Sequence, residues 1–240
     1  ADVSHYVREG GAIDEEALRR GTSVYLVGTC VPMLPERLAN DLCSLRPEVR
    51  RPAFSIVVRL DEEARVKGIW VGETVIYSAK RFTYEEAKEV LDAGEGRFYR
   101  ELSWLHGLAR RLRGRRLDEG AIAFESTDVS IRLDEEGQPI DVVGKRSSET
   151  NQLVEEFMLL ANRLIAEKMY GVRKTSRVST FMYRMHDDPS VEKLEEFAVQ
   201  VRQLGYSFVP TAKDLGRAFN KLLKTVEGTA HETIIPVSYT

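Results

Sequence analysis

The chain has 240 residues, of which 42 % are hydrophobic and 30 % are charged. These values are typical of a folded domain with a hydrophobic core and argue against wholesale disorder. No stretch approaches about 18 uninterrupted apolar residues, which argues against a membrane span. The formal net charge is −3. Proteins that coat nucleic acid electrostatically are usually basic, so this charge argues against such a binder, but not against an enzyme with a local basic channel.

Cysteine and histidine do not form the spacings of a metal site. Cys30 and Cys43 belong to no CxxC motif, and the four histidines belong to no HxxxH or HExxH motif. Two unpaired thiols suit a reducing compartment, which predicts a cytoplasmic location. The first residues do not form a secretory signal.

Helical periodicity and β-branched runs predict an α+β chain, with a mixed or antiparallel sheet flanked by helices. In chain order the predicted elements are a helix at 13–20, a strand at 23–27, one or two helical turns at 38–45, strands at 53–60 and 66–79, helices at 84–93 and 97–113, short strands at 121–124, 129–133 and 140–143, a helix at 147–169, a candidate strand at 180–185, and helices at 191–204 and 214–226. Residues 1–145 are therefore rich in strands and residues 146–240 rich in helices.

Several element ends carry specific signals. Thr83 and Glu86 have the spacing of a capping box at the start of a helix. Gly114 is expected to end the helix that begins at residue 97. The second strand of the 53–79 hairpin is long, so we expect a bulge at Gly68 or Gly72.

One acidic pair lies on the most apolar helix of the chain. Glu155 and Glu156 stand between Val154 and Phe157, on a helix predicted to be buried on more than one face. At least one of the two carboxylates must then point inward or into a cleft, where it needs a cation, a ligand or a hydrogen-bond donor. A structural ion pair and a contact with a ligand both satisfy this requirement.

Two aromatic residues and a run of arginines also have two interpretations. Tyr25 precedes a turn that contains glycine and proline, and Phe124 ends a strand beside a polar turn. Such rings are either part of the core or platforms on which nucleobases stack. The five arginines between residues 110 and 116 are either a solvated helix end or a patch that contacts phosphates.

Several sequence blocks follow one another in a familiar order. They are RGTSVY at 20–25, PMLP at 32–35, LCSL at 42–45, FTYEEA at 82–87, AIAFE at 121–125, LVEEFMLLAN at 153–162 and YRMHDDP at 183–189. Together they resemble the catalytic (RNB) domain of the ribonuclease II / ribonuclease R family, from residue 1 to about residue 223.

The resemblance implies a processive 3′→5′ exoribonuclease that threads single-stranded RNA into a channel and releases nucleoside 5′-monophosphates with water activated by Mg²⁺. It implies that Tyr25 and Phe124 are the aromatic rings that clamp the last bases, and that Glu156 contacts the terminal nucleotide. Arg184 and His186 match a family block and are candidate residues of the substrate channel.

The chain also departs from the family pattern. The aspartate run D-x5-D-x-D-D, which holds the metal in the family, does not occur in the sequence. Neither does the family's HFTSPIRRY-type block, nor an OB-type, cold-shock or S1 module. We therefore expect residues 1–240 to be the central part of a single RNB-type catalytic domain, without its metal ligands. We expect this chain alone not to hydrolyse RNA.

Two other interpretations remain. One is a catalytically inactive relative that still binds single-stranded RNA, and the other is an α+β scaffold in which Tyr25, Phe124 and Glu156 are structural. The expected partner is single-stranded RNA, with no DNA and no membrane, and the sequence indicates no obligate protein partner.

Overall fold

The computed structural model describes residues 1–122, 127–173, 181–183, 185, 190–209, 214–232 and 234–235. Three of the predicted site residues, Phe124, Arg184 and His186, lie outside these ranges. Among the described residues, no helix is long and apolar enough to cross a membrane.

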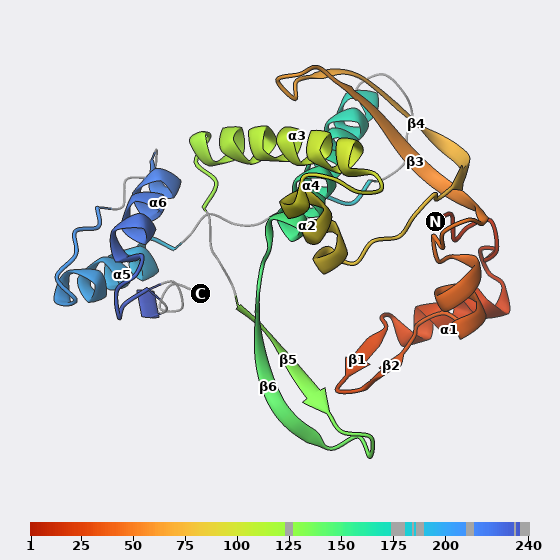
Figure 1. Cartoon of the computed structure of the whole chain (residues 1–240), viewed down its shortest axis with the longest axis horizontal. Coiled ribbons are helices and arrows are strands. Elements are labelled where there is room, and N and C mark those ends of the chain that lie inside the picture. Colours follow the sequence, from red (N-terminus) through yellow and green to blue (C-terminus); the bar gives the residue numbers. More distant parts are fainter. Residues whose placement is uncertain are drawn as a thin grey trace. The chain divides into compact units, whose positions relative to one another are not determined.

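The elements alternate two-stranded hairpins with helices (Figure 1). They are α1 (Ala12–Arg20), β1 (Val24–Leu26), β2 (Thr29–Val31), the π-helix η1 (Arg37–Leu42), β3 (Arg50–Leu60), β4 (Val66–Tyr77), α2 (Tyr84–Ala93), α3 (Tyr99–Asp118), β5 (Thr127–Leu133), β6 (Pro139–Arg146), α4 (Glu149–Arg173), α5 (Val191–Gln203) and α6 (Leu215–Val226).

Within the described residues, six strands form three separate antiparallel pairs, β1–β2, β3–β4 and β5–β6. The α+β class and the antiparallel pairing are therefore confirmed. The described strands do not join into the single flanked sheet that we expected. Each strand pairs with its neighbour in sequence across a short turn, and hydrogen bonding between hairpins, which a larger sheet requires, is not encoded by local periodicity.

The chain consists of two compact units. The first comprises Ala1–Trp104 and Thr127–Asn151, and the second comprises Leu105–Ser126 and Gln152–Thr240. Both units are therefore discontinuous in sequence. The first contains all three hairpins, and the second contains α5, α6 and most of α3 and α4.

The β3–β4 hairpin is a long, curved ribbon (Figure 1). Its register shifts where Arg59 pairs with Gly68 while Leu60 pairs with Val66, so Lys67 is the extra residue. The predicted bulge is thus confirmed beside Gly68 and not at Gly72. At Gly72 the indole of Trp70 occupies the space of a side chain, because a Cβ there would lie 2.8 Å from the ring.

The helix ends follow local chemistry with one exception. The capping box of α2 is present, because Glu86 N donates to Thr83 Oγ1 at 3.1 Å and Thr83 N donates to Glu86 Oε2 at 2.8 Å. The prediction that Gly114 ends the next helix is wrong, since α3 continues to Asp118. One glycine inside a helix costs only about 1 kcal/mol, which tertiary contacts readily offset.

The second unit has an aromatic core. Phe197, Phe208 and Phe219 pack with their ring centres 4.8–5.3 Å apart and bring α5 and α6 together. Helix α4 is less enclosed than we predicted. Apart from Thr150 in its first turn, its buried side chains follow the single line Glu156, Leu160 and Leu164, whereas Met158 is exposed.

Candidate functional site

Tyr25 lies at the centre of the β1–β2 hairpin, directly opposite Cys30. Its side chain is 80 % exposed, so the ring is not part of the core of its unit. The hairpin turns at Val27 and Gly28, and Gly28 has a φ of 78°, which favours glycine. A Cβ at Gly28 would lie 2.6 Å from the side chain of Leu133, at the end of β5. The hairpin therefore presents an open aromatic ring two residues before a turn that favours glycine.

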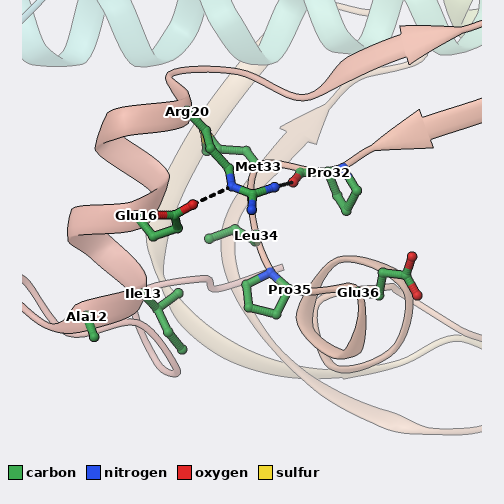
Figure 2. A pocket seen from close by; sticks show the side chains of 9 residues that line it. All are labelled: Ala12, Ile13, Glu16, Arg20, Pro32, Met33, Leu34, Pro35 and Glu36. Carbon is green, nitrogen blue, oxygen red and sulfur yellow. Dashed lines mark hydrogen bonds and ion pairs between the residues drawn. The ribbon is translucent and has the colours of Figure 1, made fainter.

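The base of this hairpin is fixed by the PMLP segment, residues 32–35. Met33 N donates to Ser23 Oγ at 2.9 Å, and Arg20 Nη1 donates to the Pro32 carbonyl at 3.1 Å. Arg20 Nε also donates to Glu16 Oε1 at 2.9 Å, and this hydrogen bond lowers the pKa of Glu16. Figure 2 shows the Arg20 guanidinium between the Glu16 carboxylate and the Pro32 carbonyl. These bonds orient the strand that carries Tyr25.

A pocket of about 530 Å³ lies between α1 and the PMLP segment (Figure 2). Its lining consists of Ala12, Ile13, Glu16, Arg20, Pro32, Met33, Leu34, Pro35 and Glu36. The sequence analysis did not predict this pocket. Arg20 donates hydrogen bonds to Glu16 and Pro32 and so holds the base of the hairpin in place. The guanidinium in the pocket lining is therefore already paired and is not a free cation for a ligand.

Glu156 is buried in the second unit and bound by arginines of α3. Its side chain is 3 % exposed. Arg116 Nη2 donates to Glu156 Oε1 at 2.5 Å and Arg116 Nε donates to Oε2 at 3.3 Å, while Arg113 Nη1 lies 3.7 Å from Oε1. Arg116 Nη2 also lies 3.2 Å from Glu155 Oε1. The cation that a buried carboxylate requires is therefore supplied by the protein.

The Glu156 carboxylate stabilises the protonated form of Arg116. Its hydrogen bond raises the pKa of the Arg116 guanidinium, which reinforces the positive charge that every arginine carries in a protein. Arg110 and Arg111, earlier on α3, are exposed and make no ion pair within the described part of the chain. The arginine run is thus divided between residues that bind acids and residues that face solvent.

The predicted site residues fall in different parts of the chain. Tyr25 belongs to the first unit and Glu156 to the second. Phe124, Arg184 and His186 lie outside the described residues. That Tyr25, Phe124 and Glu156 line one hollow stays a prediction.

Arg113 and Arg116 were not predicted as partners of Glu156. The available signals were the Glu155–Glu156 pair on an apolar helix and the arginines three residues apart. Across the ranges that the structure describes, no three His, Cys, Asp or Glu side chains are grouped closely enough to hold a metal ion.

Comparison with known proteins identifies the family. The family model described as the RNB domain matches residues 1–237. The chain belongs to the RNB family. It is 37 % identical to ribonuclease R of Thermotoga maritima over 238 residues, which cover 95 % of this chain and 32 % of that protein. It is 33 % identical to DIS3-like exonuclease 2 of Schizosaccharomyces pombe, over 98 % of this chain and 26 % of that protein.

Solved RNB structures have the same fold. RNase R of Mycoplasma genitalium, in complex with ribose-methylated single-stranded RNA, matches with a TM-score of 0.89 and 26 % identity, over 100 % of this chain and 38 % of that protein. Yeast Ssd1, a pseudonuclease, matches with a TM-score of 0.72 and 22 % identity, a likeness of fold alone. The chain spans less than two fifths of the length of each of these relatives.

Proposed function

We propose that this chain is the central part of the catalytic domain of a processive 3′→5′ exoribonuclease, which degrades single-stranded RNA to nucleoside 5′-monophosphates. The observation that carries the proposal is the RNB family match over residues 1–237. The 0.89 TM-score to an RNase R bound to single-stranded RNA supports RNA as the ligand.

Within this proposal, the first unit supplies a stacking ring. Tyr25 is exposed on a hairpin fixed at its base through Ser23 and Arg20. A base stacked on such a ring gains about 1–3 kcal/mol, regardless of sequence. Phe124 is proposed as the second ring of the clamp, and Arg184 and His186 as residues of the same channel.

The second unit supplies charge. The Glu155–Glu156 pair and the arginines of α3 form a cluster in which Glu156 is held rigidly. We place this cluster at the end of the RNA, as the resemblance implies. We also propose a cytoplasmic location, which fits the two free cysteines.

The metal of the family has no site among the described residues. The resemblance implies Mg²⁺, which prefers carboxylate oxygens and water. The described part of the chain contains no group of three potential ligands, so these residues do not fit the ion. Metal-assisted hydrolysis by the whole protein would need ligands from outside the described residues.

A catalytically inactive RNA-binding relative is the second candidate function. The lack of grouped ligands within the described ranges is compatible with both candidates. The two candidates share RNA binding by this chain and differ in what the intact protein does.

One experiment tests the proposal on the chain itself. A fluorescein-labelled single-stranded RNA is titrated with the 240-residue chain, and its products are then resolved on a gel after incubation with Mg²⁺. We expect binding that weakens as salt rises, without release of nucleotides. Absence of binding at low salt would contradict RNA as the ligand. Release of 5′-monophosphates would contradict the expectation that this chain lacks its metal ligands.

Extending the gene sequence upstream separates the two candidates. A D-x5-D-x-D-D run in the parent protein supports the exoribonuclease, and a parent without such a run supports the inactive binder.

A further inference from the structure

In the cluster on α3 and α4, the guanidinium of Arg116 has one nitrogen, Nη1, that donates no hydrogen bond within the described residues. Arg116 donates through Nε and Nη2 to Glu156, and Nη2 also approaches Glu155. A guanidinium has five N–H donors in a planar fork, and two of them are on Nη1. Nη1 makes no hydrogen bond in the described part of the chain, and the side chain is 31 % exposed.

Glu156 has the opposite character. Its side chain is 3 % exposed, and both of its oxygens accept hydrogen bonds from Arg116. A group from outside would have to displace Arg116 to reach this carboxylate, and the buried charge left behind would be costly. The carboxylate is therefore placed to orient the guanidinium and not to contact a ligand.

We infer that Arg116 binds a phosphate of single-stranded RNA through its Nη1 edge, with Glu156 and Glu155 as positioning residues that fix the plane of the guanidinium. The inference rests on the proposed function and assigns the RNA contact of this cluster to Arg116 instead of Glu156.

The surroundings of Arg116 support an anionic ligand. Arg110 and Arg113 precede it at spacings of three residues, so the three side chains lie along one side of α3. Arg110 is exposed and makes no ion pair within the described residues. Glu119, one turn beyond Arg116, forms no ion pair with it. A planar guanidinium held by the carboxylates of Glu156 and Glu155 is preorganised for a phosphate oxygen on its free edge.

The test compares how the RNA affinity of each variant depends on salt concentration. Loss of a phosphate contact makes this dependence shallower, whereas loss of a contact with a base or ribose does not. Fluorescence anisotropy measures the affinity of the 240-residue chain for a labelled oligouridylate and for the matching single-stranded DNA, over a range of KCl. The informative variant is Arg116→Gln combined with Glu156→Gln, because it removes both charges and leaves no unpaired buried carboxylate.

We expect the double variant to lose about tenfold in affinity for RNA and DNA alike. Its slope of log K against log salt should become shallower by about 0.7, the value for one phosphate of a single strand. Arg116→Lys should retain the slope, and Glu156→Gln alone should weaken binding less and leave the slope unchanged. Arg163→Gln, which removes an exposed arginine of α4, is the matched control and should change neither quantity. Circular dichroism verifies that each variant is folded.

Two results would overturn the inference. One is a wild-type slope in the double variant, and the other is a loss of RNA binding but not DNA binding in Glu156→Gln, which would make Glu156 the contact. If the wild-type chain binds no RNA at any salt concentration, the proposed function fails, and that outcome is distinct from both.

Discussion

Tyr25 is the residue whose exposure most directly predicts a function. An aromatic ring that is 80 % exposed on a hairpin with a fixed base gains little from the fold itself. Stacking on a base would remove its apolar face from water. Tyr25→Ala should therefore weaken binding of a single-stranded RNA about 5- to 150-fold, corresponding to about 1–3 kcal/mol, whereas Tyr25→Phe should bind as the wild type does. Anisotropy titration of the 240-residue chain measures both.

The control for this prediction is another exposed tyrosine of the same unit. Tyr77 lies on β4 and is also largely exposed, so Tyr77→Ala removes a comparable ring. If both variants weaken binding equally, the loss reflects general surface apolarity, and the specific role of Tyr25 is refuted.

At the residue scale, the sequence predicted features that have a local signal. Tyr25 was singled out because it precedes a turn that contains Gly28 and Pro32, and its ring is exposed, while its contact with RNA stays a prediction. The need of Glu156 for a partner also followed from the apolarity of its helix. The identity of that partner did not, because Arg116 lies 40 residues away in sequence. Contacts at such separation depend on how α3 packs on α4, which periodicity does not encode.

At the scale of elements, the capping box of α2 allows a quantitative prediction. Thr83 Oγ1 accepts from Glu86 N, and removing this acceptor leaves a helix N–H without its partner. Thr83→Ala should therefore lower the free energy of unfolding by about 1 kcal/mol, measured by urea denaturation at neutral pH. Thr22→Ala, in an exposed segment outside any helix, is a suitable control.

The box should also respond to pH. The hydrogen bond from Thr83 N lowers the pKa of Glu86, so the folded state holds this carboxylate ionised more strongly than the unfolded state does. Its contribution is present above the unfolded pKa and is lost as pH falls through the folded pKa. The stability difference between wild type and Glu86→Gln should thus vanish in acid, and a difference that persists there would contradict the ionic part of the box.

Element boundaries were predictable when a residue has one dominant local role. Gly21 ends α1 with a φ of 70°, as its position after the basic last turn predicted. Gly114 has no such role, because α3 continues through it to Arg116, which binds Glu156. The strand β2 was missed for a related reason, since its three residues form a strand only by pairing with β1.

At the scale of the whole molecule, the α+β class followed from composition and periodicity, whereas the division into two units did not. The first unit is completed by a segment more than twenty residues further along the chain, and α3 and α4 contribute to both units. Local sequence patterns do not predict such discontinuity, because a helix has the same amphipathic pattern whichever partner it packs against.

The aromatic core of the second unit gives a prediction about how the molecule unfolds. Phe219 is 1 % exposed and packs against Phe197 and Phe208, so Phe219→Ala removes the centre of the contact between α5 and α6. We expect a loss of about 3–5 kcal/mol, because a ring-sized cavity cannot be refilled by its neighbours. Hydrogen exchange followed by mass spectrometry should show faster exchange in α5 and α6, while β3 and β4 keep their wild-type protection. Val199→Ala, at an exposed position of α5, should leave the exchange pattern unchanged. Equally faster hydrogen exchange in β3 and β4 would contradict this expectation and show that the chain unfolds as one cooperative body. The β3–β4 hairpin contributes no residue to the core cluster around Phe219, so its protection would then depend on a core outside it.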